Sequence, residues 1–486
     1  MNFLVYLALS IVSKLIASVR EFGVGFIWGT GSIVDAFILA MMLPMFFIDI
    51  ASVMFNSTYI GIYVNSANKE RRFFFKDVFC FTLIYVLFTN IIVIFFLKEY
   101  IAYSDIPIET KHIIDNIIIY IVVYYSLLAF CEFYKAHLMA CEKQKMMPLP
   151  MICANIVFIS TMYYFSEGAN DIALVSCFVF SSVIQFILYI PLIIKKDSVY
   201  IMNSFVSHSR EANKKLFLKN LVPVFFNAAV NQSSKITDKV IASSLIIGSL
   251  SSLYFAQQLY ALYVNIIIVS VLSFAYPKIC KKANENKYEF SSYIVQVIIV
   301  LFVLLVYPVM LGWRYAQDIF KFILVNSTTQ NIKVVSEMFM VLLSVVVFES
   351  ISASLKRAFW ALNKMKVTVY ISGFTVIINI ILSVLLSSYY GPKGLVYSYC
   401  AATILSTMLL IFYFNKVSKI TIPKNSFLPI MTASIISVAF YILLGFFRID
   451  LNKPISLLIP GLIVVLGMFL LFVCFNKNSI SKVLKE

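Results

Sequence analysis

Five cationic side chains of this 486-residue chain fall inside long apolar stretches, away from the polar segments that separate them: Lys14, Arg20, Lys135, Lys235 and Lys239. An ionisable group at membrane depth is expensive unless it faces a partner or a water-filled cavity. Cations in such a cavity would attract an anionic substrate, because opposite charges interact strongly where the dielectric constant is low. These residues therefore predict an anion-binding lining.

Arg20 and its neighbour Glu21 lie late in the first apolar stretch, and Asp35 opens the second. Arg20 can pair with either carboxylate, because only a short turn separates the two stretches. One interpretation is a structural ion pair that fixes this hairpin. The other is a substrate-binding role, since intramembrane charges are usually functional.

Lys235 and Lys239 are four residues apart and share one helix face, and Asp238 lies beside them. Two like charges on one face repel unless an anion or a carboxylate lies between them. Asp238 pairing with one lysine while the other reaches toward water is one interpretation. A cationic lining for an anionic substrate is the other.

Other reactive residues form no recognisable metal, nucleotide or redox motif. The three histidines lack metal-binding spacing, the glycines between residues 23 and 31 do not form a dinucleotide loop, and there is no P-loop. The eight cysteines include no CxxC pair and fit apolar packing positions. We therefore expect no cofactor, no bound metal and no catalytic residue.

The elements that must position these charges are membrane-spanning helices. Hydrophobic residues make up 61% of the chain and charged residues 13%, a balance that only lipid can accommodate. The first stretch is too long for a cleaved signal peptide and is expected to stay as a helix. Fourteen spans are predicted: 3–27, 33–64, 77–97, 112–140, 148–165, 172–194, 218–247, 249–276, 290–313, 334–355, 367–388, 395–414, 427–447 and 455–475. The predicted fold class is therefore all-α, a polytopic membrane bundle.

Basic loop residues predict the orientation of this bundle. One set of connections carries 26 lysines and arginines and the opposite set carries 8. Because cytoplasmic loops are enriched in lysine and arginine, both termini are expected in the cytoplasm. The same bias explains the net charge of +16 as topology and attraction to lipid headgroups, without nucleic acid.

Three ordered groups of residues resemble the MviN/MurJ-type lipid II flippases of the multidrug/oligosaccharidyl-lipid/polysaccharide exporter superfamily. The first runs from Ser13-Lys14 through Arg20-Glu21 and Gly29 to Asp35-Ala-Phe and Leu43-Pro44. The second contains Asn231-Gln232, Asp238-Lys239, Gly248-Ser249 and Tyr254-Phe-Ala256. The third contains Arg357 to Lys364, Asn379 and Gly391-Pro-Lys-Gly394. The resemblance covers nearly the whole chain.

The resemblance implies two six-helix lobes and two further helices, with parts at 1–217, 218–415 and 416–486. It implies a cavity that opens alternately to each side of the bacterial inner membrane and holds a lipid-diphosphate headgroup. The substrate-binding residues carried over are Lys14, Arg20, Asp35, Lys235 and Lys239. Asp238 and Asn379 fall near the sodium site of some members, although a second carboxylate is absent.

This sequence departs from the family at several cavity positions. Lys14 stands where the family has an arginine, and Ile48 and Asp49 stand at two further arginine positions. Gln258 and Ala261 replace an arginine and a glutamate. These differences favour another polyprenyl-diphosphate oligosaccharide, such as an O-antigen or capsule unit, over lipid II.

Three other classes of function compete with a flippase. A cation-coupled multidrug exporter of the same superfamily would prefer an acidic cavity. A membrane oligosaccharide polymerase or ligase would need a large outer loop, which the sequence lacks. A non-transporting scaffold would fit the missing arginines. The expected partners are a lipid-diphosphate-linked glycan, membrane lipids and glycan assembly proteins, with no nucleic acid.

Overall fold

The protein was analysed as a computed structural model, which describes residues 2–197 and 236–418 except 67, 104, 105, 142, 144, 145, 286 and 363, with a few isolated positions outside these ranges. The described residues are helices joined by short turns. They divide into two compact units, residues 1–251 and 252–486, each described below by itself.

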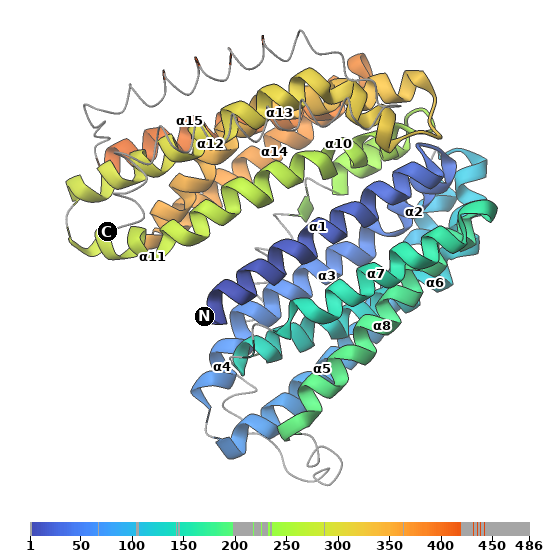
Figure 1. Cartoon of the computed structure of the whole chain (residues 1–486), viewed down its shortest axis with the longest axis horizontal. Coiled ribbons are helices and arrows are strands. Elements are labelled where there is room, and N and C mark those ends of the chain that lie inside the picture. The colour runs from blue at the N-terminus through green and yellow to red at the C-terminus, as the bar shows by residue number, and fades with distance from the viewer. Residues whose placement is uncertain are drawn as a thin grey trace. The chain divides into compact units, whose positions relative to one another are not determined.

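The first unit is a bundle of long helices (Figure 1). α6 packs on α8, α7 packs on both α8 and α1, and α2 and α3 pack on α6. The helices are α1 (Asn2–Trp28), α2 (Ser32–Ala40), α3 (Met42–Met54), α4 (Ile60–Asn65), α5 (Asn68–Tyr103), α6 (Ile108–Ala140), α7 (Pro148–Tyr164) and α8 (Asp171–Asp197).

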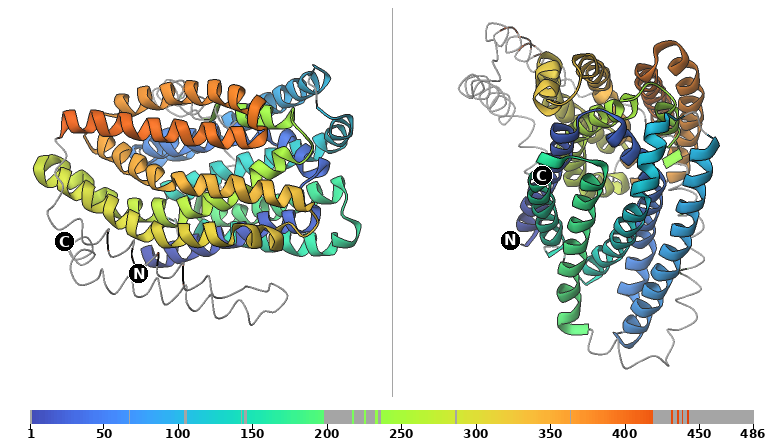
Figure 2. Two further views of the ribbon diagram at one scale, coloured as in Figure 1. Left: turned by 90° about the horizontal axis from the view of Figure 1, so that it is seen from above. Right: turned by 90° about the vertical axis from the view of Figure 1, so that its right-hand side faces the viewer.

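The second unit is built in the same way, with α12 packed on α13, and α15 packed on both α13 and α14. Two views in Figure 2 show its helices running alongside one another. The helices are α10 (Ser249–Tyr263), α11 (Ser270–Glu285), α12 (Lys287–Ile323), α13 (Thr329–Ala361), α14 (Met365–Tyr390) and α15 (Pro392–Val417). α10 begins in the last residues of the first unit.

Nine helical stretches of the described chain are long and apolar enough to cross a membrane. Two of them, Ser32–Met54 and Ser249–Leu272, join neighbouring labelled helices, and the shorter α7 is also apolar. Their positions confirm the predicted all-α membrane bundle. About half of the seventh predicted span lies outside the described residues, and the last two lie there almost entirely. The division at 217 and 415 stays a prediction.

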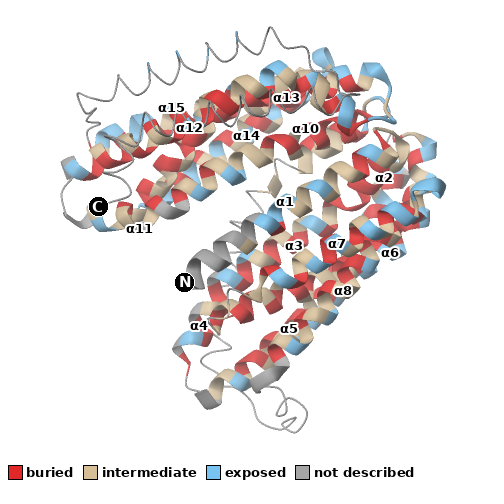
Figure 3. Cartoon of the chain, in the orientation of Figure 1, coloured by how far each residue is buried: buried red, intermediate tan, exposed pale blue. Residues whose placement is uncertain are grey.

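One helix of the first unit exposes a row of apolar side chains; Figure 3 colours each described residue by its burial. On α5, Ile84, Leu87, Phe88 and Ile91 are each more than half exposed and recur every three or four residues. This spacing forms one continuous stripe along the helix. In water such a stripe would be unfavourable, whereas lipid accommodates it.

The first unit has an aromatic core near the end of α6. Tyr59 stacks on Phe74 and packs edge-on against Phe133. The Tyr59 hydroxyl bonds Nδ1 of His137 at 2.8 Å, and His137 is 3% exposed. Tyr59 ends a π-helical turn, Phe55–Tyr59, between α3 and α4. His137 therefore joins helices within the core.

The turn between α14 and α15 requires glycine at two positions. Gly391 has φ +58°, a conformation that favours glycine. A Cβ on Gly394 would lie 2.2 Å from the carbonyl oxygen of Leu386. Both glycines of the Gly391-Pro-Lys-Gly394 motif are therefore explained by backbone geometry.

Candidate functional site

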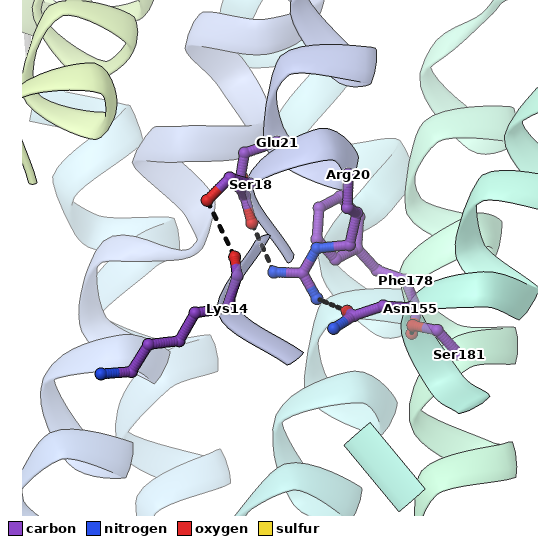
Figure 4. A network of polar contacts seen from close by, with 7 residues as sticks. All are labelled: Lys14, Ser18, Arg20, Glu21, Asn155, Phe178 and Ser181. Carbon is purple, nitrogen blue, oxygen red and sulfur yellow. Dashed lines mark hydrogen bonds and ion pairs between the residues drawn. The ribbon is translucent and has the colours of Figure 1, made fainter. Parts of the chain in front are cut away.

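The candidate site lies on α1, whose polar residues divide between two faces (Figure 4). Lys14, Ser18 and Glu21 are spaced by four and three residues, so they share one face. Arg20 and Gly23 are three residues apart and lie together on another. Arg20 therefore starts on one face and can reach the carboxylate that projects from the next.

Arg20 is held by contacts from three helices. Its Nη2 forms an ion pair with Glu21, and its Nη1 donates to Oδ1 of Asn155 on α7 at 3.1 Å. The guanidinium carbon lies 5.5 Å from the ring centroids of Phe158 on α7 and Phe178 on α8. Cation–π contacts of this kind are strongest where water is excluded. Its side chain is 22% exposed, so part of the guanidinium stays accessible.

Lys14 differs from Arg20 in its surroundings. It is exposed, and Figure 4 shows its ammonium pointing away from the Arg20 network. The Ser18 hydroxyl bonds the Lys14 backbone oxygen at 2.9 Å and leaves the ammonium uninvolved. Within the described part of the chain, the Lys14 ammonium forms no ion pair. Its charge is therefore available to an anion.

Asp35, another residue of the predicted set, is buried at 7% exposure. Its carboxylate accepts hydrogen bonds from the backbone N–H of Gly248 at 2.6 Å and of Ser251 at 2.7 Å. These groups lie at the start of α10, where N–H groups lack partners within the helix and favour a negative charge. Asp35 thus caps α10, and the pairing of Arg20 with Asp35 considered above is wrong. The alternative, Arg20 with Glu21, is confirmed.

The second predicted group is only partly described. Lys235 lies outside the described residues. Asp238 is 4% exposed and Lys239 is half-buried, both in helical backbone of the first unit. Asn379 is 2% exposed on α14 of the second unit. The anion and sodium sites proposed for these residues stay predictions.

One of the positions that depart from the family pattern, Ile48, has an ordinary packing role. Ile48 is 6% exposed and packs in a cluster with Phe47, Val93 and Tyr125. On α6, Lys135 is paired with Glu132, three residues earlier, with Oε1 and Nζ 2.6 Å apart. Lys135 is thus neutralised, unlike Lys14.

Sequence reasoning missed Asn155, Phe158 and Phe178. A buried asparagine three residues before a phenylalanine resembles ordinary helix packing. Only their proximity to Arg20 gives these residues a distinct role. An available signal was the polar Asn155 within an otherwise apolar span.

These features define a polytopic helical membrane protein. The solved structure titled "Lipid II flippase MurJ, inward closed conformation" matches with a TM-score of 0.78 at 20% identity, over 98% of this chain and all of the other. An inward-facing multidrug resistance MATE family transporter of the MOP superfamily matches with a TM-score of 0.71 at 12% identity, over 85% of this chain and 97% of the other. At such identities the likeness shows the fold.

Sequence comparison identifies the family. The "Lipid II flippase MurJ" family model matches residues 25–462, so the chain belongs to that family. A "Probable lipid II flippase MurJ" of Buchnera aphidicola is 22% identical over 425 residues, covering 83% of this chain and 81% of the relative. The corresponding Aquifex aeolicus protein is 23% identical over 266 residues, 54% of this chain. That match spans about half of the Aquifex relative, 52%.

Proposed function

We propose that the chain is a flippase that moves a polyprenyl-diphosphate-linked oligosaccharide from the inner to the outer leaflet of the bacterial inner membrane. The observation that carries this proposal is the exposed ammonium of Lys14, which forms no ion pair with the described residues and lies on the same helix as the held Arg20. A diphosphate is a dense anion, and a cation in a low-dielectric cavity binds it strongly. The family names of the relatives support the same class of substrate.

Alternating access is the proposed mechanism. A saccharide headgroup cannot cross hydrocarbon without losing its hydrogen bonds to water. A site that opens to each side in turn removes that barrier, because the headgroup stays among polar groups while the lipid tail stays in the bilayer. The proposed substrate-binding residues are Lys14, Arg20, Asp35, Lys235 and Lys239. Asp35 acts through the α10 terminus that it caps.

The substrate is either lipid II, as the names of the relatives suggest, or another diphosphate-linked glycan such as an O-antigen or capsule unit. The absence of arginines at Ile48 and Asp49 favours the latter. No step breaks a covalent bond, so we propose a transporter with no enzymatic activity. Both termini are proposed to lie in the cytoplasm, which reporter fusions at each end would test.

Reconstitution of the full chain into vesicles tests this function. Vesicles would carry fluorescent lipid II, a polyprenyl-diphosphate oligosaccharide without peptide, or the same saccharide on a monophosphate. An added quencher would report which headgroups become accessible. We expect movement of a diphosphate-linked substrate and little movement of the monophosphate. Equal movement of the monophosphate, or none of either diphosphate, would contradict the proposal.

The MATE-like fold keeps a multidrug exporter as the second candidate. It predicts export of organic cations from the same vesicles, driven by an ion gradient. The exposed ammonium of Lys14 argues against it, because a fixed cation repels a cationic drug. Drug export without glycan movement would replace the flippase proposal.

A further inference from the structure

Close packing of α1 on α7 brings Asn155 to Arg20, although they are 135 positions apart in the chain. Asn155, Phe158 and Met162 are spaced by three and four residues and share one face of α7. A Cβ on Gly23 would lie 2.5 Å from Cε of Met162, so the two helices approach closely at this glycine. Arg20 lies one turn before Gly23 and faces the same neighbour.

The contact between Asn155 and Arg20 satisfies a buried group. Asn155 is 4% exposed, and a buried amide without a partner is costly. A guanidinium can only donate, so the amide oxygen of Asn155 must face Arg20. The same hydrogen bond restricts the orientation of the Arg20 guanidinium.

Two aromatic rings restrict Arg20 further. Phe158 is 0% exposed and Phe178 is 3% exposed, so neither ring is free to move away. The rings hold the plane of the guanidinium while Asn155 holds one end of it. The remaining end lies against Glu21. The arrangement therefore fixes Arg20 before any substrate arrives.

The held position of Arg20 determines the net charge on the face of α1 that carries Lys14. Glu21 shares that face and, without Arg20, would present a negative charge two turns from Lys14. Arg20 in its held position neutralises Glu21. The face then carries the net positive charge of Lys14, which suits a diphosphate.

We propose that Asn155 is a positioning residue for the diphosphate site: it keeps Arg20 against Glu21, so that Lys14 acts on the substrate without an opposing carboxylate. This role rests on the proposed function. Under this proposal, Asn155 affects substrate affinity only because Glu21 carries a negative charge. Simple packing would give Asn155 no such dependence.

A double-mutant cycle tests this dependence. The variants are Asn155→Leu, Glu21→Gln and both together, in the full chain in lipid nanodiscs. The probe is a short-chain prenyl diphosphate, with the matching prenyl alcohol as the uncharged control. Asn155→Ala is measured as well, because it also removes the amide and can replace Asn155→Leu if that variant does not fold. Thermal unfolding midpoints of all variants show whether a loss of binding reflects a loss of stability.

We expect Asn155→Leu to weaken diphosphate binding about tenfold, the equivalent of one hydrogen bond. In the Glu21→Gln background the same change should weaken binding less than about twofold, because no carboxylate needs neutralising. Equal losses in both backgrounds would overturn the role of Asn155 and leave the flippase proposal standing. If the unaltered chain binds the diphosphate no better than the alcohol, the proposed function fails as well.

Discussion

The two units share a helical architecture but differ in the polar residues they bury. In the first unit, the buried polar residues include the ionisable Asp35, His137 and Asp238. The buried polar residues described in the second unit are serine, threonine and asparagine, all uncharged. Every hydroxyl can bond its own backbone, whereas a buried charge needs an opposing charge or several donors. The buried aspartates and the buried histidine of the described chain therefore lie in the first unit.

Individual contacts show how each unit satisfies these groups. In the second unit, Ser354 bonds the backbone oxygen of Ser350, and the hydroxyls of Ser383 and Ser398 are 2.7 Å apart between α14 and α15. Small hydroxyl residues of this kind allow helices in membranes to pack closely. In the first unit, Arg20 and Lys135 each have a carboxylate partner. These two cations are thus paired, whereas Lys14, on the site face of α1, forms no ion pair within the described part of the chain.

The largest effect on stability is expected from Arg20→Ala. Removing the guanidinium leaves Glu21 partly buried without its arginine, at an expense of about 3 kcal/mol. The double variant with Glu21→Gln should recover most of the stability but not transport. Thermal unfolding in detergent and vesicle assays would measure the two separately. A fully stable Arg20→Ala protein would show that the first unit does not depend on charge pairing.

A smaller effect is expected from Asp35→Ala, because the N-terminus of α10 loses its acceptor. Loss of a helix cap lowers stability by about 1–2 kcal/mol. Asp35→Asn keeps one acceptor oxygen and should lower stability less than Asp35→Ala does. Hydrogen exchange at residues 248–252 should accelerate in the alanine variant and leave α13 unchanged. Unaltered exchange in this turn would mean that the cap contributes nothing.

The smallest effect is expected from Ser383→Ala in the second unit. It removes one hydroxyl of a buried pair, for a loss of about 1 kcal/mol, while the other hydroxyl keeps its bond to the backbone oxygen of Leu395. Transport should stay near normal. A transport defect as large as that of Arg20→Ala, measured at equal protein level, would break the contrast between the units.

Much of the fold followed from the sequence, because apolar length and loop charge are local properties. The pairs Arg20–Glu21 and Glu132–Lys135 were also accessible, since each partner is close in the chain. The partner of Asp35 was not: Gly248 is 213 positions away and contributes only a backbone N–H. Asn155 was missed for the same reason, because its role depends on the approach of α7 to α1 at Gly23.

The most direct test of the account is transport by Lys14 variants in reconstituted vesicles. Lys14→Ala should reduce movement of a polyprenyl-diphosphate glycan at least about tenfold, since an unpaired cation facing a diphosphate is worth more than a neutral hydrogen bond. Lys14→Arg should retain most of the activity, and both variants should unfold at the temperature of the unaltered protein, because Lys14 is exposed. Normal transport by Lys14→Ala would contradict the claim that this cation binds the substrate.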